Sequence, residues 1–246
     1  MTRIALVAAF AAAFATSALA QDKTDGEWRG TLSLSLSYST GNTDANALNV
    51  AADAARATAA DKFTLGATAL RSQSKNEGVT TKTAELYKVG GRYDRNLGER
   101  LFGFGSANVE KDKLQRLDLR TSLGAGAGWH LVSTPDTTVD VFAGLGATRE
   151  EYTTSSRNFT EIVLGEESSH RLFERTTFKQ KLTVFPSLED SGEYRANLDA
   201  TLATAIAAGW NFNVTLSSRY VSDPQPGLES TDTLLLVGIA STFGPK

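Results

Sequence analysis

Cysteine is absent from this chain of 246 residues, and histidine occurs only as His130 and His170. Without cysteine the chain can form no disulfide bonds, thiolate nucleophiles or thiolate-ligated zinc sites. The formal net charge is −3, whereas a nucleic-acid-binding protein usually carries a basic stripe. These absences argue against a nucleic-acid partner and a thiolate-ligated metal site. We expect no bound metal and no cofactor.

Long hydrophobic runs are also missing after the first twenty residues. Within those twenty, Arg3 supplies positive charge, residues 4–15 are apolar, and Ala18-Leu19-Ala20 matches the small-x-small pattern read by signal peptidase. The apolar run is shorter than the ~20 residues that a membrane helix needs, which disfavours an uncleaved anchor. We predict a signal peptide over 1–20, cleavage between Ala20 and Gln21, and one mature domain over 21–246.

Alternation with a period of two is what the rest of the chain does contain. Residues 117–131 place Leu, Thr, Ala and Trp at odd positions and charged or small residues and His at even positions. Similar alternation occurs at 32–38, 139–147, 194–206, 212–220 and 235–243. The longest runs exceed the ~5–6 residues of an ordinary globular strand. Strands of a transmembrane barrel alternate in this way, which also explains a mean hydropathy of only −0.22.

A soluble β-sandwich is the alternative explanation of this alternation. Its strands would be shorter and its turn signals closer together, at roughly 8–12 residues. Two stretches fit either pattern less well. Residues 46–58 are rich in Ala, yet Leu48 and Val50 still alternate with Asn49 and Asp53, which favours a strand. Residues 101–109 alternate too poorly for their faces to be assigned.

The number of strands follows from parity, because single-chain bacterial barrels have an even number, with both termini in the periplasm. Counting forward, connections at 41–44, 75–80 and 111–115 are predicted outside, and those at 59–62, 96–100 and 133–136 in the periplasm. Counting backward from Phe243, the loops at 224–227 and 187–193 are outside and the turn at 208–211 is periplasmic. The counts agree only if 159–169 and 176–185 are both strands, joined near 172–174. We therefore predict an all-β, antiparallel transmembrane β-barrel of about 12 strands.

The chain resembles a known family over nearly all of its mature length. The matching segments are SYSTGNTD at 37–44, GRYD at 91–94, DLRTSLGAG at 118–126, LGEESS at 164–169, RYVSDP at 219–224, GL at 227–228 and TDTL at 231–234. Together they resemble the YdiY-like family of salt-induced outer-membrane proteins, a domain-of-unknown-function family. The resemblance implies an outer-membrane barrel and supplies no reaction or ligand to assign to particular residues.

A barrel of this kind implies a location and a set of partners. We expect export to the bacterial outer membrane, with lipid and lipopolysaccharide around the barrel. Periplasmic chaperones and the barrel-assembly machinery are the expected partners during biogenesis. Outer-membrane barrels commonly end in an aromatic residue that this machinery reads, and Phe243 follows Leu235, Val237 and Ile239 in that position. Gly244-Pro245-Lys246 follow the aromatic residue, which departs from the usual pattern.

Charged residues on the polar faces of the strands are the candidate functional residues. Charges inside a barrel either line a water-filled path or pair into a network that plugs it. The predicted lumen residues are Arg116, Asp118, Arg120, Asp140, Lys179, Lys181, Arg195, Asp199 and Arg219. Their signs are mixed, whereas selectivity filters usually concentrate one sign in a ring, so the sequence predicts no ion preference.

Catalysis is a weaker alternative, and no catalytic residue is assigned. Ser168 and His170 share a strand face, as a nucleophile and its base would, but no third group with a known spacing accompanies them. Both histidines also fall near predicted periplasmic turns. His130 is expected to be an interfacial residue beside Trp129, which belongs to the aromatic girdle.

Two other patterns have simple structural interpretations. Gly124, Gly126 and Gly128 alternate within a strand instead of opening a helix, so they are expected to leave room in the lumen or to bend the sheet. The stretches 161–167 and 224–232 carry several acids. A solvated or lipopolysaccharide-facing loop is favoured there over a divalent-cation site, which would need several oxygen ligands.

Three interpretations of function remain open at this point. The first is a narrow pore for small solutes, and the second is a structural or envelope-stress barrel with a plugged lumen. The sequence favours these two equally, because lumen width depends on strand shear and on side-chain filling. A membrane enzyme is the third and least favoured.

Overall fold

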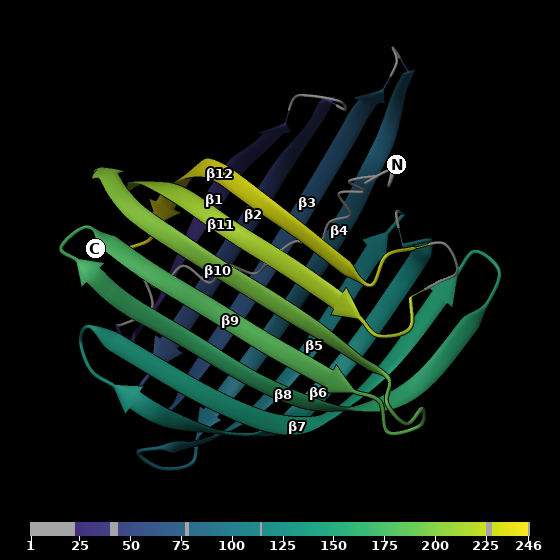
Figure 1. The fold of residues 1–246 in the computed structure, drawn as a ribbon. Helices are drawn as coiled ribbons and strands as arrows, with labels where there is room; N and C mark the ends of the chain where they lie inside the picture. The colour runs from purple at the N-terminus through teal and green to yellow at the C-terminus, as the bar shows by residue number, and fades with distance from the viewer. Residues whose placement is uncertain (1–22, 40–43, 77–78, 114, 225–227, 246) are drawn as a thin grey trace.

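The computed structural model describes residues 23–39, 44–76, 79–113, 115–224 and 228–245. They form twelve antiparallel strands that close into one barrel (Figure 1). The strands are β1 (Asp25–Ser39), β2 (Asp44–Thr58), β3 (Asp61–Asn76), β4 (Val79–Asn96), β5 (Leu101–Asp112), β6 (Leu117–Ser133), β7 (Thr137–Tyr152), β8 (Ser156–Phe173), β9 (Thr176–Pro186), β10 (Tyr194–Ala207), β11 (Trp210–Val221) and β12 (Thr231–Phe243). The predicted signal peptide lies outside the described residues.

Each strand pairs with its neighbours in sequence, and β12 pairs with β1 to close the sheet. This closing seam pairs Gly30–Leu36 with Val237–Phe243. Both chain ends therefore lie at one end of the barrel, which we call the terminal end, and the other is the opposite end. Closure satisfies the backbone groups that an open sheet edge would expose.

The strand count of twelve, with antiparallel order, is confirmed. The two strands that parity required are present as β8 and β9, and both extend beyond the predicted limits. The Ala-rich stretch is strand β2, as its alternation indicated. In β5 the buried side chains of Phe102 and Phe104 assign the inner face that the sequence left open. No helix among the described residues is long and apolar enough to cross a membrane.

Apolar side chains cover the outer wall because alternate residues of each strand point away from the lumen. Leu123 and Leu145 are each 59% exposed there, and Leu34 and Ile239 also face outward on the two strands of the seam. At the terminal end this wall carries exposed aromatic side chains: Trp28, Phe63, Tyr93, Trp129, Phe173, Trp210 and Phe243. Such a ring is typical of the interface between lipid tails and headgroups.

Candidate functional site

The lumen contains an elongated cavity lined by β3 to β11, with about 160 Å³ open to water-sized molecules. A buried water needs roughly 10–15 Å³ of such space, so the cavity can hold on the order of ten waters. It runs from Lys62 and Asp94 near the terminal end toward Glu110 and Arg195 in the opposite half. The lumen therefore contains a narrow chamber that is large enough for water instead of being packed throughout.

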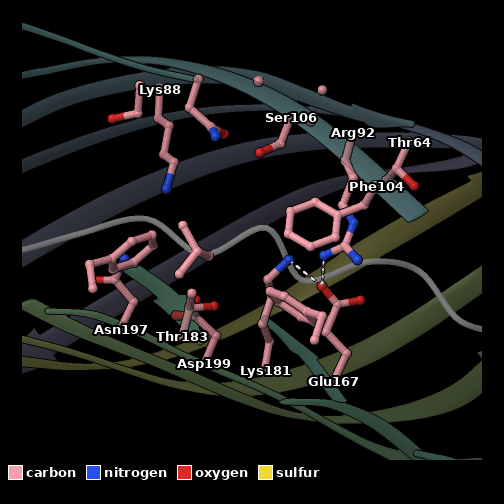
Figure 2. A pocket seen from close by; sticks show the side chains of 18 of the residues that line it. Thr64, Lys88, Arg92, Phe104, Ser106, Glu167, Lys181, Thr183, Asn197 and Asp199 are labelled. Atoms are coloured by element: carbon pink, nitrogen blue, oxygen red, sulfur yellow. Dashed lines mark hydrogen bonds and ion pairs between the residues drawn. The ribbon is translucent and has the colours of Figure 1, made fainter. Parts of the chain in front are cut away.

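Charged side chains, among them Lys88, Arg92, Glu167, Lys181 and Asp199, are part of the lining of this chamber (Figure 2). Among the described residues that line it, six are cationic and four are acidic. They are Lys62, Lys88, Arg92, Lys181, Arg195 and Arg219, against Asp94, Glu110, Glu167 and Asp199. The lining thus has an excess of positive charge, although the whole chain has a net charge of −3.

One group of ionic contacts crosses the lumen. Glu167 of β8 accepts from Lys181 Nζ on neighbouring β9 at 2.5 Å and from Arg92 Nη1 on β4 at 3.5 Å. Figure 2 shows both cations directed at this one carboxylate. Because β4 and β8 are four strands apart, the contact with Arg92 joins separated parts of the wall and narrows the chamber.

Aromatic rings hold the guanidinium of Arg92 in place. Its Cζ lies 4.3 Å from the ring centre of Phe142 and 4.5 Å from that of Phe104. Asp94 Oδ1 also accepts a hydrogen bond from Arg92 Nε at 2.7 Å. Cation–π contacts and a fixed ion pair restrict the side chain to one position. Arg92 is therefore a preorganised part of the constriction.

Glycine makes room for these inward-facing rings. A Cβ on Gly128 would overlap the ring of Phe102, its register partner, and a Cβ on Gly165 would overlap the ring of Phe142. On Gly126 it would collide with the backbone of Ala143 and Gly144. The expectation that the β6 glycines leave room in the lumen is met at Gly128, whose inner face carries an aromatic ring.

A second ionic network lies nearer the opposite end. Glu150, fully buried, accepts from Arg120 Nε at 2.7 Å and from Arg157 Nε at 2.8 Å. Arg120 also donates to Glu110 at 3.0 Å. Each acid has at least one cationic partner, which offsets part of the desolvation cost of the buried charges. The network joins β5 to β8 along one side of the barrel.

Arg195 stands where two cavities meet. It donates to Glu161 Oε2 at 2.6 Å, and its Cζ lies 4.9 Å from the ring centre of Phe185. A smaller cavity, with about 20 Å³ open to water-sized molecules, extends from these residues to the loop residues Ser187 and Glu193 at the opposite end. Arg195 and Phe185 line both cavities, so they form the boundary between the chamber and that end of the barrel.

Apolar side chains fill another part of the lumen. Leu70, Leu86, Leu234 and Leu236 point inward from β3, β4 and β12 and are at most 5% exposed, packed with Ala47 of β2. This cluster breaks the usual division into an apolar outer face and a polar inner face. It occupies the side of the barrel next to the seam, whereas the chamber is lined by residues of β3 to β11.

A model of the family described as "Protein of unknown function, DUF481" matches residues 32–243. The chain belongs to this family. The resemblance to the YdiY-like proteins, which form this family, is thereby confirmed. No curated protein matches the chain.

Solved structures share the barrel fold of this DUF481 protein. The translocator domain of the autotransporter NalP from Neisseria meningitidis has a TM-score of 0.50 and 15% identity, over 93% of this chain and 92% of that one. An outer-membrane channel from Pseudomonas putida F1 has a TM-score of 0.51 and 10% identity, over 89% and 96%. The NanC porin has a TM-score of 0.51 and 9% identity, over 86% and 98%. Identities this low show the fold alone.

Most charged residues singled out in the sequence of this DUF481 protein lie on the inner face. Arg120, Lys181, Arg195, Asp199 and Arg219 belong to the chamber or its ionic networks, and Arg219 donates to Asp199 at 2.8 Å. Lys179 is on the same face of β9 as Lys181. Asp140 is on β7 near the terminal end, 2.7 Å from His130 Nδ1.

Arg116 and Asp118 are not on the inner face, because the backbone is irregular where β6 begins. Arg116 is exposed in the turn before β6, with a φ of 56°. Asp118 is exposed because the β6–β7 pairing shifts between Leu117 and Leu119. A β-bulge inserts one residue and changes which side chains face inward. Leu117, expected on the outer face, is fully buried instead.

The two histidines lie on opposite faces of the barrel wall. His130 lies next to Trp129 near the terminal end and faces inward, with its ring centre 4.7 Å from that of Phe102. His170 lies on the outer face of β8, with its ring stacked on Phe178 of β9. Within the described ranges, no group of three or more His, Asp or Glu residues could hold a metal ion.

Several chamber residues were missed from the sequence. Lys88 and Arg92 alternate with Tyr87, Val89 and Tyr93 on β4, a period-two signal that could have identified them. The acidic stretch 161–167 is part of strand β8 instead of a solvated loop, so Glu161 and Glu167 are ion-paired in the lumen. Lys62, Asp94 and Glu110 are the other charged lining residues that the sequence did not identify.

Proposed function

We propose that this protein is an outer-membrane channel for small, preferably anionic solutes. The observation that carries the proposal is the chamber in the lumen, with six cationic and four acidic side chains among its described lining residues. A lining with excess positive charge lowers the barrier for anions more than for cations. Structures named as a porin and as an outer-membrane channel share the fold, which is consistent with this function.

The proposal includes an orientation and a route of export. Cleavage after Ala20 would release the chain into the periplasm, and the terminal end of the barrel would face the periplasm. Outer-membrane lipid and lipopolysaccharide would surround the apolar wall. Chaperones and the assembly machinery would act before insertion. Solutes would then enter between the loops at the opposite end and pass Arg195 before they reach the chamber.

A plugged barrel that supports the envelope is the second candidate. The contact of Arg92 with Glu167 across the lumen and the inward cluster around Leu70 and Leu86 favour it, since both fill space that a solute would need. These two functions differ in one property, which is whether ions cross the lumen.

Conductance in planar lipid bilayers tests the proposal. Purified barrels should give discrete steps of small conductance in potassium chloride, with a reversal potential that indicates anion preference. Steps with cation preference would contradict the charge argument. Silent barrels would favour the plugged alternative, provided that their heat-modifiable migration on gels shows that they are folded. A Glu167→Gln variant that is also folded and silent would exclude a channel that is merely closed by this ion pair.

A further inference from the structure

A polar patch interrupts the apolar outer wall on β8 and β9. It consists of Glu166, Ser168 and His170 on β8 and Gln180 on β9. Their neighbours Glu167 and Lys181 line the lumen, so strict alternation places the four patch residues on the other face. Gln180 Nε2 donates a hydrogen bond to Glu166 Oε2 at 3.0 Å. The patch is therefore a group of neighbouring polar side chains on the surface that faces lipid, and two of them, Gln180 and Glu166, are hydrogen-bonded.

Apolar side chains border Glu166 on three sides within this surface. Its register partners are Val141 on β7 and Leu182 on β9, and Leu164 precedes it on the same face. Toward the terminal end, the strand continues past His170 to the exposed Phe173 at its end. Glu166 thus lies between the apolar Leu164 and the aromatic side chains of the terminal end.

Lipid tails cannot form hydrogen bonds with the carboxyl group of Glu166. A carboxyl group accepts several hydrogen bonds, and Gln180 supplies one. No cation among the described residues forms an ion pair with Glu166. Ionisable groups within the membrane are costly, and where they occur they usually contact other protein groups. The patch needs an occupant that supplies hydrogen-bond donors at this depth.

A second copy of this chain provides suitable donors. The patch combines one strong acceptor, Glu166, with the donors Ser168 and Gln180, so it is complementary to itself. A two-fold axis brings the same surface of two subunits together, with each acceptor facing the other subunit's donors. Small outward residues flank the patch, with Ala143 on β7 and Ala200 on β10, and small side chains allow close approach in membranes.

We propose that β8 and β9 form the contact surface of a two-fold homodimer in the membrane, in which Glu166 accepts hydrogen bonds from the other subunit. Packing and interchain hydrogen bonds drive association in lipid, where the hydrophobic effect does not. The proposal is independent of conduction through the lumen. A structural barrel could dimerise in the same way.

The absence of cysteine from the chain allows a clean cross-linking test. A Ser168→Cys variant in isolated outer membranes, treated with an oxidant, should give a disulfide-linked species of twice the monomer mass on non-reducing gels. The matched control is Val50→Cys, which faces outward on β2, six strands away around the barrel. It should remain monomeric under the same conditions.

A second substitution tests the role of the carboxyl group. In the Ser168→Cys background, Glu166→Leu should reduce the cross-linked fraction several-fold, whereas Leu164→Ile on the same face should leave it unchanged. Heat-modifiable migration would show that each variant is folded. Equal cross-linking of the Ser168→Cys and Val50→Cys variants would overturn the proposal. So would cross-linked products whose mass is that of a different protein, or a Glu166→Leu variant that dimerises as well as its parent.

Discussion

Arg92 and Glu167 meet across the lumen from strands four positions apart, with 3.5 Å between Nη1 and Oε1. Lys181 shares the same carboxylate at 2.5 Å. Glu167 is therefore the group that links one wall of the chamber to the other. Its removal would break the link between the two walls, while Arg92 would keep its ion pair with Asp94 and its aromatic contacts.

Replacement of Glu167 by Gln should increase the single-channel conductance of the barrel. The neutral amide no longer attracts Arg92 and Lys181, so the cross-lumen contact weakens and the positive potential of the chamber rises. The measurement is made in planar bilayers. Glu166→Gln is the matched control, because the adjacent residue faces lipid and its substitution leaves the lumen unchanged. Equal conductance of the two variants would contradict the hypothesis that the contact between Arg92 and Glu167 narrows the chamber.

Lys88→Gln should reduce anion preference. Lys88 points into the chamber (Figure 2), and its removal leaves five cationic lining residues against four acidic ones among those described. The reversal potential in a salt gradient should move toward zero. Lys23→Gln, which changes an exposed residue before β1, should have no such effect. A shift of the same size in both variants would mean that overall charge, not the lining, sets selectivity.

Gly128→Ala should destabilise the barrel, because the added Cβ would overlap the ring of Phe102. Overpacking of this kind costs about 1–3 kcal/mol. Denaturant unfolding of detergent-solubilised protein measures the loss. Gly105→Ala on β5 is the control, since no atom lies within 4 Å of the position its Cβ would take. A double variant, Gly128→Ala with Phe102→Leu, should regain part of the lost stability. Ring packing would be excluded as the cause if Gly105→Ala were as destabilising as Gly128→Ala and the double variant regained nothing.

Leu123→Arg should be far more harmful than Ser122→Arg. Leu123 is 59% exposed on the outer wall, whereas Ser122 lines the chamber. An Arg in the lipid-facing midplane costs about 2–4 kcal/mol, and less near the interfaces. The fraction of heat-modifiable barrel in outer membranes reports the difference. Equal yields would mean that the two faces of β6 have been exchanged.

Phe243→Ala should lower the amount of folded barrel in the membrane. Phe243 is 52% exposed at the terminal end, and its ring covers Gly30, its register partner across the seam. Deletion of residues 244–246 should leave the yield unchanged, although it removes a hydrogen bond from Arg29 to the carbonyl of Pro245. Immunoblots of heat-modifiable protein from outer membranes decide between these outcomes. An undiminished yield of Phe243→Ala would exclude this residue as the assembly signal.

The period-two pattern was sufficient to predict the strands, because the membrane imposes a strict difference between the two faces. Even the Ala-rich β2 followed from the contrast of Leu48 with Asn49. The bulge at Asp118 could not be predicted, since nothing in the sequence marks an extra residue within an otherwise regular run. A one-residue shift in register exchanges the inner and outer faces of the residues beyond it. Alternation therefore predicts an outward Leu117, although this residue is buried.

The arrangement of the lumen was less accessible from sequence than the strands. Which side chains meet across a barrel depends on strand stagger, a property that alternation does not encode. Arg92 and Glu167 are 75 positions apart in sequence, and no local pattern couples them. The inward leucines at 70 and 86 fit the composition of an outer wall as well as that of a core. Their contacts with Leu234 and Leu236 of β12 place them in the lumen, and the sequence pattern does not reveal those contacts.

The seam between β1 and β12 also has a kinetic consequence. It joins the two ends of the sequence through a register from Gly30 to Leu36, whereas β1 pairs with β2 from Asp25 to Ser39. Contacts between such distant segments form late, because the intervening chain must be ordered first. The same short ladder is the place where the folded barrel should open first. Amide hydrogens of β12 are therefore expected to exchange with solvent through sub-global opening before those of β6 and β7.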